Sequence, residues 1–229
     1  MNLFNMGNPD FWIRMLYYLP GIIIALSFHE FAHAFVAHLV GDDTARNMGR
    51  MTVNPLAHLD PIGFISMILL GFGWAKPVPV TPRNYRGSKR RADIFVSLAG
   101  ITMNLLLAIL FLLLFYLLNL QFGGINSVAN RMIYYAIVFN LSLMIFNLIP
   151  IHPLDGSHVL EDLLIRRTGP KPFMFMRQYS MYLLLGLLIV LNVTGILSTV
   201  LDYVLRGLNT LFSAVFGVDV LDLFLRGII

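Results

Sequence analysis

The chain has 229 residues, of which 58% are hydrophobic and only 12% are charged, and its mean hydropathy is +0.76. Soluble domains carry about 25% charged residues, so half that share excludes a soluble globular protein and indicates an integral membrane protein. Cysteine is absent, which excludes disulfides and thiolate metal sites and leaves His, Asp and Glu as metal ligands.

The first hydrophobic segment runs from residue 11 to residue 40 and is interrupted only by Arg14, Glu30 and three histidines. About 20 apolar residues cross a bilayer core, so the segment predicts one tilted spanning helix that ends at Gly41. The N-terminus lacks the basic region and the cleavage site of a signal peptide. We therefore expect this first span to be kept.

The next region is less regular. Residues 46–60 predict short extended pieces at the membrane surface, and residues 61–75 are uncharged but too short to cross, which favours a re-entrant or interfacial segment. In residues 74–86 valine alternates with proline, which is typical of an edge strand or short β-hairpin. A surface loop fits these residues equally well. An extended edge there would pair with an unfolded substrate by strand addition.

Further spans are predicted at residues 94–118, 132–149 and 178 to about 200, with an uncharged linker at 119–130. The tail after the last span predicts an amphipathic helix in the interface, with one apolar face formed by Leu205, Leu208, Phe212, Val215 and Phe216. The predicted fold is an all-α polytopic membrane protein of about four spanning helices, with the re-entrant segment, the hairpin and the amphipathic tail. We expect a single membrane-embedded domain over residues 1–229.

Basic residues lie mainly in two segments, 76–91 and 166–177, and the 119–130 linker between them has none. Because basic loops stay in the cytoplasm, both segments are predicted to face it, with the N-terminus outside. This is the pattern of a multi-pass plasma-membrane protein whose basic loops meet anionic lipid, and we expect no nucleic-acid partner.

His29, Glu30 and His33 form an H-E-x-x-H motif in the cytoplasmic half of the first span. Residues four apart lie on the same face of a helix, so the two imidazoles can hold one metal ion with a carboxylate beside it. This is the zinc-metalloprotease arrangement, with glutamate as the general base. The motif alone arises by chance in soluble proteins, but ionisable groups within a span are costly and by default functional.

A catalytic zinc ion usually has three protein ligands, and Asp155 is the best candidate for the third. It is the first acidic residue after Asp93, it follows the third span, and its charge offsets that of the metal. His38 falls on the opposite side of the first helix and is a poor candidate. The preceding run contains Asn147 and Pro150, and Pro150 breaks the helix. Such a break at membrane depth requires a protein or water-filled environment.

Three elements together, H-E-x-x-H, then Ala99, Gly100 and Asn104 as A-G-x-x-x-N, then N-x-x-P-x-x-x-L-D-G, resemble the site-2 protease family of intramembrane zinc metalloproteases. The resemblance covers about residues 11–165, with residues 166–229 adding a span and the tail. The sequence shows no PDZ or CBS domain, so we expect the short form of the family. Ile101 and His152 stand where members often carry proline.

The resemblance implies one Zn²⁺ ion bound by His29, His33 and Asp155, with Glu30 as the base. Asn147 is implied to hold the substrate or the oxyanion, and Asn104 either contacts substrate or packs between helices, of which we favour packing. His152 is most simply a polar loop residue, and His158 is expected beside the site without ligating. The implied substrates are transmembrane proteins or peptides, and an oligomer or gating partner is left open.

A competing hypothesis from another class is a metal-ion transporter or a metal-binding scaffold. It explains two histidines and an aspartate at membrane depth, but it gives Glu30 no role. The chain also lacks the internal repeat that such transporters usually carry.

Overall fold

The computed structural model describes residues 9–70, 73–122 and 127–225. Within them the helices are α1 (Pro9–Leu39), α2 (Thr44–Asn47), η2 (Pro55–Ala57), α3 (Pro61–Leu70), η3 (Pro82–Asn84), α4 (Lys89–Phe122), α5 (Ser127–Leu148), α6 (Asp155–Thr168), α7 (Lys171–Gln178), α8 (Ser180–Thr194), α9 (Ile196–Phe216) and α10 (Val220–Leu225).

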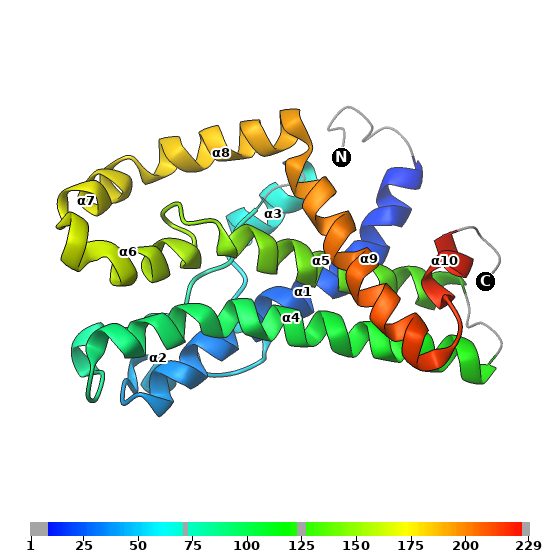
Figure 1. Cartoon of the computed structure of the whole chain (residues 1–229), viewed down its shortest axis with the longest axis horizontal. Helices are drawn as coiled ribbons and strands as arrows, with labels where there is room; N and C mark the ends of the chain where they lie inside the picture. Colours follow the sequence, from blue (N-terminus) through cyan, green and yellow to red (C-terminus); the bar gives the residue numbers. More distant parts are fainter. Residues whose placement is uncertain (1–8, 71–72, 123–126, 226–229) are drawn as a thin grey trace.

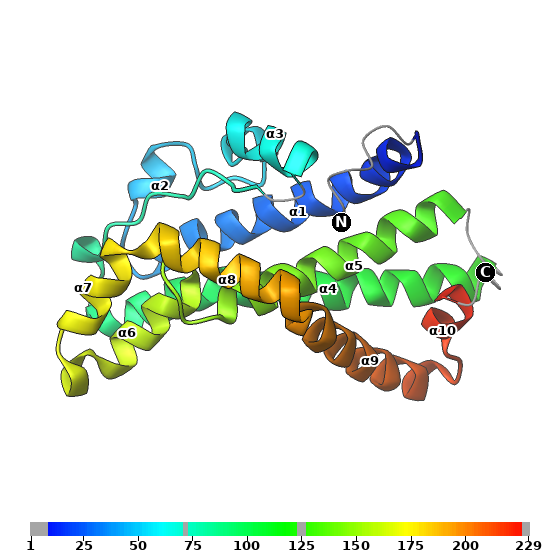
Figure 2. The same cartoon turned by 90° about the horizontal axis from the view of Figure 1, so that it is seen from above.

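Helices α1, α4 and α5 lie side by side and form the central bundle (Figures 1 and 2). All three are long and apolar enough to cross a membrane, which confirms the first three predicted spans. Their contacts bury a core centred on α4 and α5, in which Leu112, Phe115, Ile137 and Leu141 are completely enclosed.

The predicted fourth span is broken in the structure. Helices α7 and α8 meet at an angle of 75°, so the described residues hold three candidate spans, or four if this bent pair counts as one. Helix α8 has 15 residues and is therefore only about 22 Å long, against a hydrocarbon core of about 30 Å. Gly195, with φ of 65°, ends α8 and turns the chain into α9.

The predicted amphipathic tail is present as α9, which crosses the bundle obliquely (Figure 1). Leu205 is buried in the central core, and Leu208, Phe212 and Phe216 pack against it. The Tyr116 hydroxyl on α4 donates a hydrogen bond to Asn209 Oδ1 at 2.5 Å. Most of the apolar face of α9 is therefore taken up by the protein core rather than left for the interface.

The predicted β-hairpin is wrong, because the described residues form no strand. Residues 73–81 are extended, but their only β-type pairing in the described chain is an isolated antiparallel bridge between Leu59 and Ala75. Pro77, Pro79 and Pro82 have no N–H to donate to a ladder. Side chains from elsewhere bind the backbone of this segment instead. Helix α3, before it, has ten residues and is too short to span.

Candidate functional site

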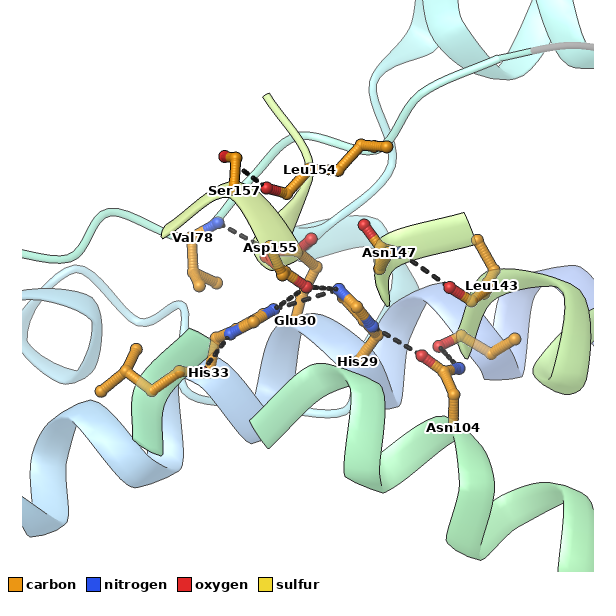
Figure 3. Close-up of polar contacts among 12 residues, drawn as sticks. His29, Glu30, His33, Val78, Asn104, Leu143, Asn147, Leu154, Asp155 and Ser157 are labelled. Atoms are coloured by element: carbon orange, nitrogen blue, oxygen red, sulfur yellow. Dashed lines mark hydrogen bonds and ion pairs between the residues drawn. The ribbon is translucent and has the colours of Figure 1, made fainter. Parts of the chain in front are cut away.

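Helix α1 carries His29, Glu30 and His33 in its C-terminal half, where all three side chains are almost fully buried. The two histidines are one turn apart on the same face, as the spacing predicts, and their Nε2 atoms lie 3.0 Å from each other. Figure 3 shows both rings pointing toward one place between α1, α4 and the start of α6.

Asp155 completes this group from the first turn of α6. Its Oδ2 atom lies 3.3 Å from Nε2 of His29 and 3.3 Å from Nε2 of His33 (Figure 3). The three side chains place one ligand atom each within 4.8 Å of one another, which no other His, Asp or Glu cluster of the described residues does.

The outer nitrogens of both histidines are bound by α4. His29 Nδ1 lies 2.6 Å from Asn104 Oδ1, and His33 Nδ1 lies 2.7 Å from the carbonyl oxygen of Val96. A carbonyl oxygen can only accept, so each Nδ1 carries the hydrogen in these bonds. In neutral imidazoles the Nε2 atoms then carry no hydrogen. The Nε2 lone pairs of both histidines and the carboxylate oxygen of Asp155 therefore converge with no hydrogen between them.

The orientation of the Asn104 amide is set by its own partners. Its Nδ2 donates to the carbonyl of Ala25 at 3.2 Å and to Asn140 Oδ1 at 3.0 Å, which leaves Oδ1 facing His29. Asn140 in turn donates to the carbonyl of Ala136 at 2.8 Å. Both asparagines are completely buried. Asn104 therefore contacts His29 directly, in addition to packing between the helices.

Two glycines let the backbone approach the site. A Cβ atom on Gly100 would lie 2.4 Å from His33 Nε2 and 2.5 Å from His29 Cε1, so only glycine lets α4 pass behind both rings. A Cβ atom on Gly156 would lie 2.5 Å from the carbonyl oxygen of Leu148. Gly156 thus lets α6 start directly against the end of α5, which brings Asp155 to the histidines.

The carboxylate of Glu30 lies beside the cluster of His29, His33 and Asp155, and it is held by the extended segment. The backbone N–H of Val78 donates to Glu30 Oε2 at 2.7 Å (Figure 3). Val78 is itself buried. This bond fixes one carboxylate oxygen of Glu30.

Asn147 lies on the last turn of α5, on the same side of the histidines as Asp155 (Figure 3). Its Nδ2 donates to the carbonyl of Leu143 at 3.1 Å, which uses one of the two N–H groups of the amide. Its predicted contact with substrate stays a prediction.

The remaining histidines do not belong to the cluster that His29, His33 and Asp155 form among the described residues. His38 contacts Asp43 at 2.6 Å on the far side of α1. The rings of His152 and His158 lie 5.6 Å from each other after α5. His58 is completely buried and lies 2.6 Å from the carbonyl of Thr52, so it braces the loop before α3 rather than facing solvent.

Sequence reasoning missed three contributors to this site. Val78 and Val96 act through backbone atoms, and such contacts leave no signature in the side chains. Asn140 did leave a signature in the sequence, because a polar residue within a span is costly unless it has a partner.

Comparisons with known proteins identify the family of this chain. The family model described as "Peptidase family M50" matches residues 17–191, which is three quarters of the chain. The chain belongs to this family.

Several relatives support the M50 assignment. YwhC of Bacillus subtilis, which is named as a zinc metalloprotease, is 42% identical over 155 residues, covering 65% of this chain and 69% of YwhC. Rip2 of Mycobacterium tuberculosis (strain H37Rv), named likewise, is 30% identical over 182 residues, covering 77% of this chain and 68% of Rip2. Zinc metalloprotease MJ0392 of Methanocaldococcus jannaschii is 25% identical over 164 residues, covering 72% of this chain and 38% of that protein. No solved structure matches the chain significantly.

These matches confirm the resemblance to site-2 proteases on which the sequence interpretation rests. The M50 assignment also favours a peptidase over the metal-transporter hypothesis. With its long apolar helices, this M50 peptidase is a multi-pass membrane protein.

Proposed function

We propose that this chain hydrolyses peptide bonds of membrane-spanning substrates, with one Zn²⁺ ion held by His29, His33 and Asp155. The observation that carries the proposal is the convergence of Asp155 Oδ2 on both Nε2 atoms, at 3.3 Å from each. Three buried lone-pair donors repel one another unless a proton or a metal cation lies among them. Two imidazoles and one carboxylate are a ligand set that suits catalytic zinc and leaves a fourth position open.

The contacts behind these ligands also fit zinc. A metal-binding histidine usually donates its other ring nitrogen to a carbonyl or carboxylate, which fixes the tautomer. His33 does so to Val96, and His29 does so to Asn104. The bound ion would supply a Lewis acid that activates water and polarises the scissile carbonyl.

The residues around that ion transfer the proton and stabilise the developing negative charge. Glu30 takes a proton from the attacking water and later delivers it to the leaving nitrogen. Val78 holds Glu30 Oε2 through its N–H, so Oε1 is the oxygen that handles the proton. Asn147 donates its second amide hydrogen to the carbonyl oxygen on which negative charge develops.

We further propose that the site faces the cytoplasmic half of the membrane, with the N-terminus outside. Arg90 Nη2 donates to the carbonyl of Leu163 at 3.2 Å, so the two basic segments flank one end of the bundle. The start of α1 lies at the other end (Figure 1). Basic loops on a shared side support a cytoplasmic placement of that end.

A substrate helix must unwind before its amides reach Glu30, because its backbone groups are otherwise hydrogen-bonded within the helix. We therefore expect cleavage near helix-weakening residues of the substrate. The extended residues 73–81 beside Glu30 form the surface along which an unwound segment would lie.

The decisive variant is Glu30→Gln, assayed in vesicles on a membrane-spanning peptide and compared with His38→Gln on the same helix. We expect Glu30→Gln to keep bound zinc and lose cleavage, because glutamine cannot take a proton. His38→Gln should keep both, because His38 contacts Asp43 outside the site. Normal cleavage by Glu30→Gln would refute the role of Glu30, and unchanged zinc binding by His33→Gln would refute the ligand set.

A further inference from the structure

A buried arginine lies on the far side of the extended segment from Glu30. Arg50, in the loop after α2, is only 9% exposed. Its Nη2 atom donates to the carbonyl oxygen of Lys76 at 2.8 Å and to that of Pro77 at 3.3 Å. Within the described residues Arg50 forms no ion pair with a carboxylate. Burying a cation without a counter-ion is costly, so this contact needs an explanation.

The explanation lies in the peptide group between Pro77 and Val78. Its carbonyl oxygen accepts from Arg50, and its N–H donates to Glu30 Oε2 at 2.7 Å. One planar peptide unit therefore connects the guanidinium on one side with the carboxylate on the other. Hydrogen bonds in such a series polarise one another in a low-dielectric site.

The local sequence restricts rotation of this peptide group. Pro77 has a fixed φ, and Val78 precedes Pro79, which limits Val78 to extended conformations. The segment is also held at both ends. Lys76 N–H donates to the carbonyl of His58 at 2.7 Å, and Thr81 N–H donates to Asp42 Oδ2 at 2.6 Å.

We propose that Arg50 is a positioning residue for Glu30 and acts through the Pro77–Val78 peptide group. The guanidinium holds that peptide so that its N–H meets Glu30 Oε2, and its charge offsets that of the buried carboxylate. Both hydrogen bonds come from the Nη2 atom, and a lysine ammonium on its shorter, flexible stem does not reproduce the position of that atom. The inference deepens the proposed function, because it rests on Glu30 being the base.

The kinetic test compares Arg50→Gln and Arg50→Lys with Arg46→Gln. Arg46 is an exposed arginine on the adjacent α2, paired with Asp43, and serves as the matched control. We expect kcat of both Arg50 variants to fall about a hundredfold, the loss typical of a small misplacement of a reacting group. KM and zinc content should stay near the wild-type values. Methylguanidine should restore part of the activity of Arg50→Ala.

A wild-type kcat in Arg50→Gln overturns the proposal, and so does a loss of activity that merely follows a loss of zinc. A second measurement needs no activity. In the zinc-free protein, Arg50→Gln should lower Tm less when Glu30 is already Gln, because the two groups are coupled. Additive changes in Tm overturn the role of Arg50 whatever the role of Glu30. Normal cleavage by Glu30→Gln, in contrast, removes the proposed function and leaves the Tm coupling intact.

Discussion

Helices α5 and α8 are both rich in leucine, isoleucine and valine, yet only α5 is built into the bundle. Along α4 and α5 four asparagines are at most 6% exposed and bond to one another, to His29 or to backbone carbonyls: Asn104, Asn119, Asn130 and Asn140. Helix α8 has no buried residue, and Figure 1 shows it running apart from the central helices. Apolar side chains gain little by leaving lipid for one another. Polar and small residues therefore decide which helices associate here.

The largest expected effect comes from replacing one glycine of the bundle and one glycine of α8 by alanine. Gly100→Ala places a methyl group 2.4 Å from His33 Nε2, whereas a Cβ on Gly186 of α8 meets nothing within 4 Å. We expect Gly100→Ala to lose zinc and at least about a hundredfold of activity. Gly186→Ala should change activity by no more than about twofold. Zinc content and the rate of peptide cleavage are measured for both variants. Equal effects at the two glycines would contradict the difference between the bundle and α8.

A smaller effect is expected for stability. Asn119 and Asn130 donate to each other reciprocally, at 2.8 Å and 3.0 Å. Asn119→Leu removes both of these buried hydrogen bonds, which should lower the free energy of unfolding in detergent by about 1–3 kcal/mol. The double variant Asn119→Leu/Asn130→Leu should recover part of that loss. Asn192→Leu on exposed α8 should change it by less than about 0.5 kcal/mol, and an equal loss there would contradict the comparison.

The smallest expected effect lies where α4 meets α6. Burial and the facing Asp93 raise the pKa of Asp162 to about 7, with Glu161 adding to the rise and Arg90 opposing it. In the unfolded chain Asp162 titrates near 3.8, so between these two values the folded protein holds a proton that the unfolded chain has released. The contribution of Asp162 to stability therefore falls as pH rises through this window and is level above it.

Asp162→Asn should remove that slope and raise Tm at about pH 8 relative to the wild type. Thermal unfolding at about pH 5 and about pH 8 measures the difference. Asp202→Asn on α9 is the control, because Asp202 is exposed and paired with Arg206. A wild-type slope in Asp162→Asn would exclude Asp162 as its source.

Much of the bundle was predictable because hydrophobic length alone marks a spanning helix. The same signal failed at the predicted span from 178 to about 200, because Gly195 ends α8 within that apolar run and Tyr179 separates α8 from α7 at its start. Composition does not show where an apolar helix bends. The tail showed a related limit, because periodicity gave the apolar face of α9 but not whether lipid or protein covers it.

The candidate site, like the bundle, was predictable only in part. The spacing of His29 and His33 and the position of Asp155 after the third span predicted a group that the fold indeed brings together. The alternation of valine and proline suggested a hairpin, but three prolines remove the donors that a ladder needs. Whether Glu30 would meet Val78 depended on tertiary contacts of the backbone, which no local pattern encodes.

One consequence follows from the way α4 holds both histidines. Val96 and Asn104 are two turns apart, about 12 Å along the helix axis, and each fixes one ring on α1. A slide of α1 past α4 by a single residue, about 1.5 Å, would release both rings together. These two hydrogen bonds thus resist sliding of α1 along α4, and the packing of the two helices fixes the positions of both rings.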